Sequence, residues 1–297
     1  MITVKNVTKK YGKFKAVDNI SFEINDGEII GLLGPNGAGK STTMNILTGF
    51  IEPTEGEVII NGYNISKKPK KAKKCIGYMP EGVPLYKDMT VKEFVTYMAE
   101  LKGVKKDQIK ESVDQAIQDT WLQNVRKVLI RNLSKGYKQR VSMAGALVGN
   151  PEIIILDEPT VGLDAVNRNY FYDALIESYS ENPRTIIIAT HLIEEVENLL
   201  EEVVIIKDGD VKITDSLEDI RKKAYYISGN QEKLNSIFEL ENQTPIKHFG
   251  DNYTYWYYGD LNQNIKDKMD ELNISYENIS LNDLFLSMNR KDVALYE

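Results

Sequence analysis

The eight residues from Gly34 to Ser41 constrain the fold more than any other part of the chain. They read Gly-Pro-Asn-Gly-Ala-Gly-Lys-Ser and have the spacing of a phosphate-binding loop, G-x-x-x-x-G-K-[ST]. The apolar segment Glu28–Leu33 before the loop predicts a buried strand, and a helical pattern follows through Leu47. Glycines let backbone N–H groups turn inward around an anion, and a helix start adds its positive dipole end. The order strand, loop, helix therefore predicts an α/β fold with a phosphate site.

Two side chains at the end of this loop have the chemistry that a nucleoside triphosphate needs. Lys40 would neutralise the β- and γ-phosphates, and Ser41 would ligate Mg²⁺. Kinases, GTPases and ATPases all use such a loop. The Asn-Lys-x-Asp type of motif that usually reads guanine is absent from the sequence, which disfavours a GTPase and leaves the other classes open.

Two adjacent carboxylates follow a second strand-like segment. Ile153–Leu156 is wholly apolar and leads directly into Asp157 and Glu158. Ligands of open α/β sheets bind at the carboxyl ends of parallel strands, and alternation along a strand points neighbouring side chains in different directions. We therefore expect Asp157 to hold Mg²⁺ and Glu158 to polarise the attacking water as a general base.

Strands and helices alternate through the middle of the chain. The segments Thr185–Ala189 and Val203–Lys207 predict further buried strands, with helical patterns between them. Such alternation favours a mostly parallel sheet that is covered on both faces. Thr90 and Glu93 have the spacing of a capping box and predict a helix through Leu101.

The composition shifts after about Leu217. Strand-like aromatic segments at Ala224–Ile227 and Tyr253–Tyr258 alternate with helical patterns near Glu232–Leu240 and Asn262–Leu272. This predicts a small α+β domain whose aromatic side chains form a core rather than a binding platform.

Charge and apolar run lengths exclude several classes of function. The chain has 37 basic and 44 acidic residues, a net charge of −7, so bulk attraction to nucleic acid is not expected. A membrane span needs about 20 mainly apolar residues, and the sequence has no such run or secretory signal. The lysine run Lys67–Lys74 predicts a solvated helix face or, less favourably, a basic docking patch. The single cysteine, Cys75, fits a reducing compartment.

Four further short segments stand in the motif order of one family. They are Gly77-Tyr78-Met79-Pro80-Glu81, Leu133-Ser134-Lys135-Gly136-Tyr137, Gly162-Leu163-Asp164 and Thr190-His191. Residues 1 to about 217 thus resemble, from end to end, the nucleotide-binding subunit of ATP-binding cassette (ABC) transporters. The resemblance implies a P-loop NTPase cassette with a RecA-like mixed sheet, an antiparallel β subdomain and a helical subdomain at about residues 82–150. Residues 218–297 would form a C-terminal accessory α+β domain.

The resemblance also assigns roles to individual residues. It implies catalysis by Glu158, His191, Lys40 and Glu81, and Mg²⁺ binding by Ser41, Asp157 and Glu81. Tyr11 would stack on adenine, and His191 would contact the γ-phosphate. Ser134 and Gly136 would hold ATP from the opposite chain of a head-to-tail dimer. The implied nucleotide-binding residues are Tyr11, Gly34, Pro35, Asn36, Gly37, Ala38, Gly39, Lys40, Ser41, Thr42, Ser134, Gly136 and Asp164.

Two departures from the usual family motifs indicate a subgroup. Lys135 and Tyr137 replace a glycine and the glutamine of the Leu-Ser-Gly-Gly-Gln signature, and Glu81 replaces a glutamine. Both variants resemble separate ATP-binding chains of type-2 exporters of drugs, peptides or similar cargo. The resemblance implies an ATPase that works as a homodimer or heterodimer on a separate integral-membrane permease. It would be cytoplasmic and peripheral on the inner face of the cell membrane.

Two alternatives stay open at this point: a soluble regulatory or sensor ABC ATPase, and an importer ATPase. Proteins that act on ribosomes or DNA are disfavoured, since they usually fuse two cassettes or insert a coiled coil. The loop after Glu81 would receive the permease through apolar side chains, or these would pack under the helical subdomain. The residues concerned are Val83, Leu85, Tyr86 and Met89.

Overall fold

The computed structural model of the chain describes residues 1–82, 84–240 and 243–290. The chain divides into two compact units. The first contains residues 1–191 and 204–214, and the second contains residues 192–203 and the chain from residue 215 onward. Residues 192–203, which the sequence analysis assigns to the cassette, thus belong to the second unit. The domain boundary at about Leu217 stays a prediction.

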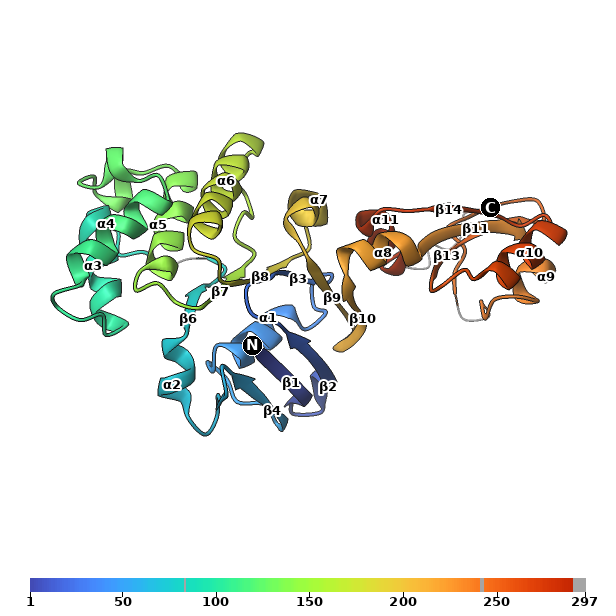
Figure 1. Cartoon of the computed structure of the whole chain (residues 1–297), viewed down its shortest axis with the longest axis horizontal. Coiled ribbons are helices and arrows are strands. Elements are labelled where there is room, and N and C mark those ends of the chain that lie inside the picture. Colours follow the sequence, from blue (N-terminus) through green and yellow to red (C-terminus); the bar gives the residue numbers. More distant parts are fainter. Residues whose placement is uncertain (83, 241–242, 291–297) are drawn as a thin grey trace. The chain divides into compact units, whose positions relative to one another are not determined.

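A six-stranded sheet forms the centre of the first unit, in the order β10-β9-β3-β8-β7-β6 (Figure 1). Strands β3, β8, β7 and β6 pair in parallel, so their carboxyl ends lie at one edge. Every residue of β3, β7 and β8 is buried, as apolar runs in a sheet covered on both faces require. The strands are β3 (Ile29–Leu33), β6 (Ile76–Met79), β7 (Ile153–Asp157), β8 (Thr185–Thr190), β9 (Glu202–Lys207) and β10 (Asp210–Ser216).

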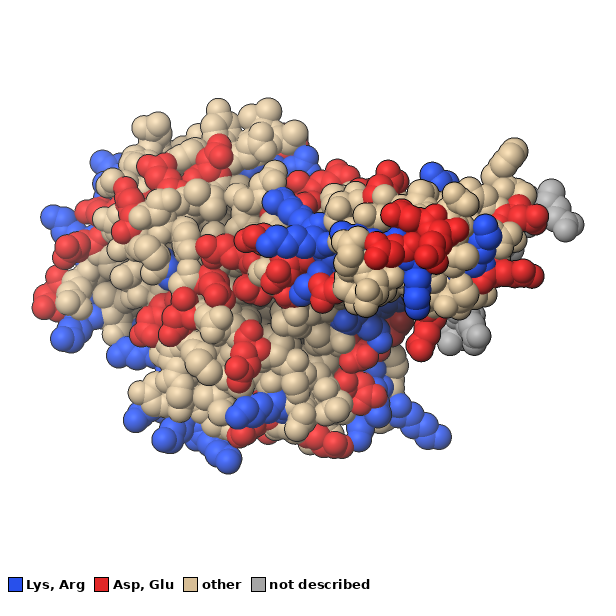
Figure 2. Space-filling model, turned by 45° about the vertical axis from the view of Figure 1, so that its right-hand side comes forward, with Lys and Arg blue, Asp and Glu red and all other residues tan. Residues whose placement is uncertain are grey.

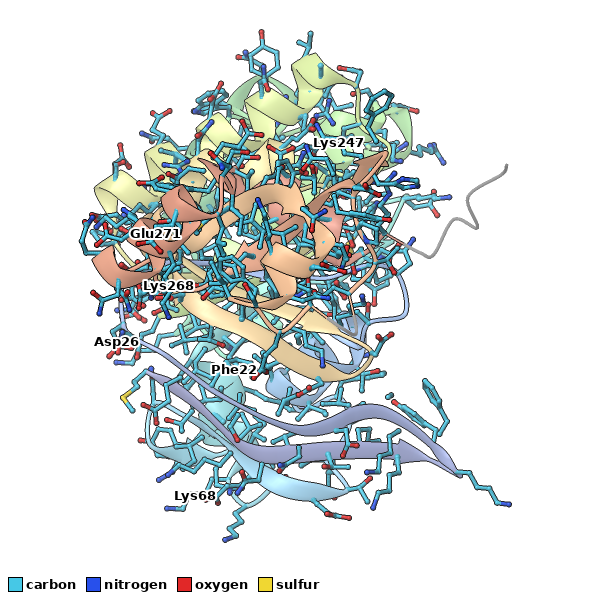
Figure 3. The ribbon with its side chains drawn as sticks, turned by 90° about the vertical axis from the view of Figure 1, so that its right-hand side faces the viewer. Phe22, Asp26, Lys68, Lys247, Lys268 and Glu271 are labelled. Carbon is cyan, nitrogen blue, oxygen red and sulfur yellow. The ribbon has the colours of Figure 1, made fainter. Side chains whose placement is uncertain are left out.

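A second, four-stranded sheet has the order β2-β1-β4-β5, and its strands pair antiparallel. One apolar cluster joins it to the central sheet and to helix α1 (Lys40–Leu47). Phe22 of β2, labelled in Figure 3, belongs to that cluster. The strands are β1 (Ile2–Tyr11), β2 (Phe14–Ile24), β4 (Glu55–Ile60) and β5 (Tyr63–Asn64).

A helical part follows β6 in the sequence. The capping box predicted at its start is confirmed, because Glu93 N donates to Thr90 Oγ1 and Thr90 N donates to the Glu93 carboxylate. Helices α3, α4 and α5 bury apolar side chains in one cluster. The helices of this unit after α1 are α2 (Pro69–Lys74), α3 (Val91–Leu101), α4 (Ile109–Asp119), α5 (Lys135–Leu147) and α6 (Ala165–Glu181), with 3₁₀ turns η1 (Gln123–Val125) and η2 (Ile130–Asn132).

The second unit is an α+β arrangement, with an antiparallel sheet in the order β12-β13-β11-β14. Buried aromatic side chains, among them Tyr225, Phe238 and Tyr255, form its core. The helix predicted over residues 232–240 ends at Asn235, where the Ser236 hydroxyl donates to Lys233 O and competes with the helical pattern. Its strands are β11 (Ala224–Asn230), β12 (Lys247–Phe249), β13 (Asn252–Tyr258) and β14 (Ser275–Asn278). Its helices are α7 (Ile193–Val196), α8 (Leu217–Lys223), α9 (Gln231–Asn235), α10 (Gln263–Glu271) and α11 (Leu281–Met288), with the 3₁₀ turn η3 (Glu197–Leu199).

Acidic and basic side chains are intermingled over the face drawn in Figure 2. The lysine run lies on and before α2, where all its lysines are exposed, and Lys68 is labelled at the margin of the ribbon in Figure 3. Within residues 1–82, 84–240 and 243–290, no helix combines the length and the apolar character that a membrane crossing requires.

Candidate nucleotide site

A cavity of about 580 Å³ lies where the phosphate loop, the tip of the β1–β2 hairpin and the loops after β6, β7 and β8 meet. Most of the predicted site residues line it, although they come from segments far apart in the sequence. The predicted residues in its wall are Tyr11, Asn36, Gly37, Gly39, Lys40, Ser41, Thr42, Glu81, Glu158 and His191.

Backbone geometry shapes the phosphate loop. Gly39 precedes α1 with a φ of 110°, and a Cβ there would lie 2.7 Å from Ala16 O, so only glycine fits. A Cβ on Gly34 would lie 2.5 Å from Ile206 O. Lys40 Nζ is buried and donates to Gly34 O at 2.6 Å and to Pro35 O at 3.3 Å. The lysine is therefore held inside the curve of the loop.

Pro35 and Ala38 build the loop without lining the cavity. Ala38 N donates to Pro35 O at 3.1 Å, which closes a turn, and Gly209 N donates to Ala38 O at 3.0 Å. Ser41 is exposed in the first turn of α1. Its hydroxyl thus stands at the helix N-terminus, where backbone N–H groups favour an anion.

Glu158 is the most constrained side chain of the site. It has a φ of 45°, a left-handed conformation that costs free energy in a residue with a Cβ. It is 7% exposed, and its carboxylate accepts from Thr190 Oγ1 at 3.1 Å and contacts His191 Nδ1 at 2.9 Å. Lys40 Nζ lies 3.5 Å from the same carboxylate. Three groups thus fix one carboxylate at the cavity wall.

Asp157 is buried beside the cavity but lacks a full set of partners. Its side chain is 4% exposed, and within the described chain Oδ1 has no hydrogen-bond partner. Burial, followed by the charges of Glu158 and Glu81, raises the pKa of Asp157 to about 6, although Lys40 opposes the shift. Burial, followed by the charges of Asp157 and Glu81, raises the pKa of Tyr78 to about 12. An unpartnered buried oxygen in a field of carboxylates fits a hard divalent cation such as Mg²⁺.

Ser134 and Gly136 do not line the cavity. Ser134 caps α5 by accepting from Tyr137 N at 3.3 Å. Gly136 approaches α6 so closely that a Cβ would lie 2.3 Å from Asn167 Oδ1. The signature therefore presents a helix N-terminus at another place on the first unit.

Asp164 is likewise outside the cavity wall, at the start of α6. It accepts from Asn167 N at 2.9 Å and from Asn167 Nδ2 at 2.7 Å, and these bonds hold its pKa below the ordinary value. Asn167 therefore contacts both Asp164 and Gly136. Because it lies outside every family motif used above, the sequence analysis missed it.

Three further residues missed by the sequence analysis line the cavity: Phe14, Ala16 and Val161. Phe14 pairs with Tyr11 across the hairpin, and their side chains are 65% and 51% exposed. Cross-strand partners lie on the same face of a sheet. The available signal was an aromatic pair around the Gly12 turn, because neighbouring exposed apolar side chains can mark a binding surface.

A smaller cavity of about 330 Å³ lies beside the loop after Glu81. Leu85 lines it and packs, with Met89, against the helical cluster, whereas Tyr86 is exposed and contacts Tyr97 edge to face. Val83 lies outside the described residues. Leu85 and Met89 therefore pack under the helical subdomain, and docking of the permease on this loop stays a prediction. Three lysines also line this cavity: Lys87, Lys135 and Lys138.

Comparison with known proteins places this geometry in a family. A family model described as ABC transporter matches residues 17–161. An uncharacterized ABC transporter ATP-binding protein of Methanocaldococcus jannaschii is 42% identical over 226 residues, which are 76% of this chain and 81% of that protein. The linearmycin resistance ATP-binding protein of Bacillus subtilis is 36% identical over 211 residues, which are 71% of this chain and 68% of that protein.

A similar solved structure is a dimeric ATP-binding cassette in a post-hydrolysis state, bound to ADP and phosphate. It has a TM-score of 0.65 and 30% identity, and the match covers 73% of this chain and 99% of that one. The phosphate loop and the buried carboxylates at the end of β7 are consistent with these similarities. The chain belongs to the ATP-binding proteins of ABC transporters and is an ATP-binding and ATP-hydrolysing cassette of that family.

Proposed function

We propose that ATP with Mg²⁺ occupies the 580 Å³ cavity and that Glu158 is the general base of hydrolysis. The environment of Glu158 carries this proposal. Its carboxylate is fixed by Thr190, His191 and Lys40 at the cavity wall, so it can accept a proton from a water without reorganising. The proposal therefore requires that ATP binds with a phosphate close to this carboxylate.

Each of the other residues in and around the cavity would bind a different part of ATP. Lys40 supplies positive charge to the phosphates, and the loop from Gly34 to Gly39 supplies N–H donors. Ser41, Asp157 and Glu81 would hold Mg²⁺, which neutralises charge on the phosphates when it is bound. His191 contacts the γ-phosphate, and Tyr11 offers its ring to adenine.

The dimer proposal rests on the residues that stay outside the cavity. Ser134, Gly136 and Asp164 lie at the starts of α5 and α6, where N–H groups favour an anion. They would complete the site of a second copy or of a related cassette. The dimeric form of the similar solved cassette supports this arrangement.

The proposed transport role is supported by the family and by the smaller cavity beside the loop after Glu81. We propose that the chain energises a separate integral-membrane permease that exports a drug, a peptide or a similar cargo, at the cytoplasmic face of the membrane. The name of the linearmycin resistance relative favours export. This cavity, lined by Leu85, Ile130 and three lysines, offers an apolar and basic docking surface for the permease.

Glu158→Gln tests the base. The amide keeps the size of the side chain but accepts no proton, so we expect steady-state ATP hydrolysis to fall by about 10²–10⁴-fold. ATP affinity should persist, and an ATP-bound dimer should accumulate on size exclusion with light scattering. Turnover near the wild-type rate would remove Glu158 as the base.

Ser134→Ala tests the contribution across the dimer. Hydrolysis should fall more than ATP binding to the monomer, because Ser134 lies outside the cavity of its own chain. Isothermal titration at concentrations below dimerisation measures the monomer affinity. Equal losses in both measurements would place Ser134 in the site of its own chain, against the proposal.

A further inference from the structure

A second polar cavity, of about 360 Å³, lies on the first unit between α4, the end of α5 and the segment that leads into β8. None of its lining residues lines the nucleotide cavity. Its volume falls near the lower end of the range of small-molecule sites. The nucleotide chemistry described above leaves it without a role.

Arg184 is the unusual side chain of this cavity. It is only 6% exposed, and its Nε donates to Asn182 O at 3.0 Å. Within the described residues, the two terminal amino groups make no hydrogen bond and no ion pair of 4 Å or less. Arginine stays charged in proteins; burial lowers the pKa of Arg184, and the charge of Asp119 opposes that shift. The terminal amino groups still have no oxyanion in direct contact, and they could bind one with two parallel hydrogen bonds.

The opposite charge lies on α4. Asp119 is buried, and its two oxygens each accept one bond, from Gln115 Nε2 at 2.7 Å and from Ser178 Oγ at 3.3 Å. Each carboxylate oxygen can accept a second bond. Glu111 adds an exposed carboxylate in the cavity wall. With one cation and two carboxylates, the wall is net negative and disfavours a simple anion.

We propose that this cavity binds a small zwitterion of the size of an amino acid. Its carboxylate would pair with the terminal amino groups of Arg184, and its ammonium group would face Glu111 and Asp119. The apolar side chains of Val104, Ala116 and Leu147 in the same wall would accept an aliphatic side chain. This site does not depend on the nucleotide roles proposed above.

A binding panel tests the proposal directly on the full chain. The twenty L-amino acids are screened at millimolar concentration by the shift in melting temperature, and hits are titrated by calorimetry. Acetate, inorganic phosphate and methylammonium are run beside them. We expect at least one aliphatic or amide-bearing amino acid to raise the melting temperature and bind, whereas the single-charge probes do not.

Two variants and one control locate the site. Arg184→Lys keeps the charge but loses the two-pronged contact, and Glu111→Gln removes an exposed carboxylate; each should weaken amino-acid binding at least tenfold. Glu100→Gln, an exposed carboxylate on α3 outside the cavity, should bind as the wild type does. If Arg184→Lys fails to fold, Glu111→Gln decides alone.

Three outcomes would overturn the proposal. The first is that no amino acid shifts the melting temperature. The second is that acetate or phosphate stabilises the chain as strongly as any amino acid, which would make the cavity a simple anion site. The third is unchanged binding in Glu111→Gln.

Discussion

Each of the two units contains a cluster of side chains around one aspartate. The two aspartates differ in whether both of their carboxylate oxygens accept hydrogen bonds. In the first unit, Asp157 keeps an oxygen that has no hydrogen-bond partner among the described residues, and its pKa is raised to about 6, mainly by burial. In the second unit, Asp215 accepts from Lys223 Nζ at 2.6 Å, Tyr258 OH at 2.7 Å and Ser216 N at 3.0 Å. Burial alone would raise the pKa of Asp215, but these bonds lower it.

The difference separates a binding group from a structural one. Asp215 is satisfied by its own unit, so folding gains from its charge. Asp157 is charged at a cost that Lys40 offsets only in part, and a bound cation would offset more of it. A raised pKa together with an unpartnered oxygen therefore indicates a ligand more reliably than burial or charge alone.

Asp157→Asn should have the largest effect on stability. In the wild type the folded state binds the Asp157 proton more tightly than the unfolded state, so stability falls as pH rises from about 4 to about 6. The shift corresponds to about 3 kcal/mol. Without Mg²⁺ and nucleotide, Asp157→Asn should be more stable than the wild type by about that amount at pH 7 and equal to it below pH 4.

Chemical denaturation in the presence of a chelator, at pH 4 and at pH 7, measures this difference. Since both proteins share every other titrating group, the difference between them isolates Asp157. A stability gain of the same size at both pH values would mean that the gain is unrelated to charge.

Asp215→Asn should act in the opposite direction. An amide weakens the bonds from Lys223 and Tyr258, and we expect a loss of about 1–3 kcal/mol in the free energy of unfolding at pH 7. Because the pKa of Asp215 is lowered by folding, this contribution is present above about pH 4 and disappears as pH falls further. Urea unfolding measures it, and Tyr258→Phe, which removes one donor, is the milder control. A variant that gains stability would contradict the structural role.

The smallest effects concern the aromatic pair at the hairpin tip. Tyr11→Ala should weaken ATP binding by about 1–3 kcal/mol, by analogy with base–aromatic stacking. Phe14→Ala should cost about 1 kcal/mol or less, because this ring is the more exposed of the two. Titration with ATP measures both, and Phe14→Tyr is the matched control. Unchanged affinity in both alanine variants would place adenine elsewhere.

The sequence predicted those parts of the site whose residues lie close together along the chain. The phosphate loop, the acidic pair after β7 and the capping box at Thr90 are each defined by residues within a few positions of one another. The structure bears out the α/β cassette and its central parallel strands, because apolar runs that end in polar loops leave few other solutions.

Residues that join the site through pairing across space were missed. Phe14 reaches the cavity because it pairs with Tyr11 in the hairpin, and Val161 does so through the turn after Glu158. Asn167 contacts Gly136 and Asp164 because two helices start side by side. No local pattern encodes these contacts, since each depends on register or on helix packing.

The left-handed backbone at Glu158 has a consequence for how such chains diverge. Glycine or asparagine would adopt that φ more easily, and relief of about 1–2 kcal/mol is typical. A chain that keeps hydrolysis must therefore retain Glu158 and forgo that gain in stability, so position 158 cannot diverge toward the residues that its backbone favours.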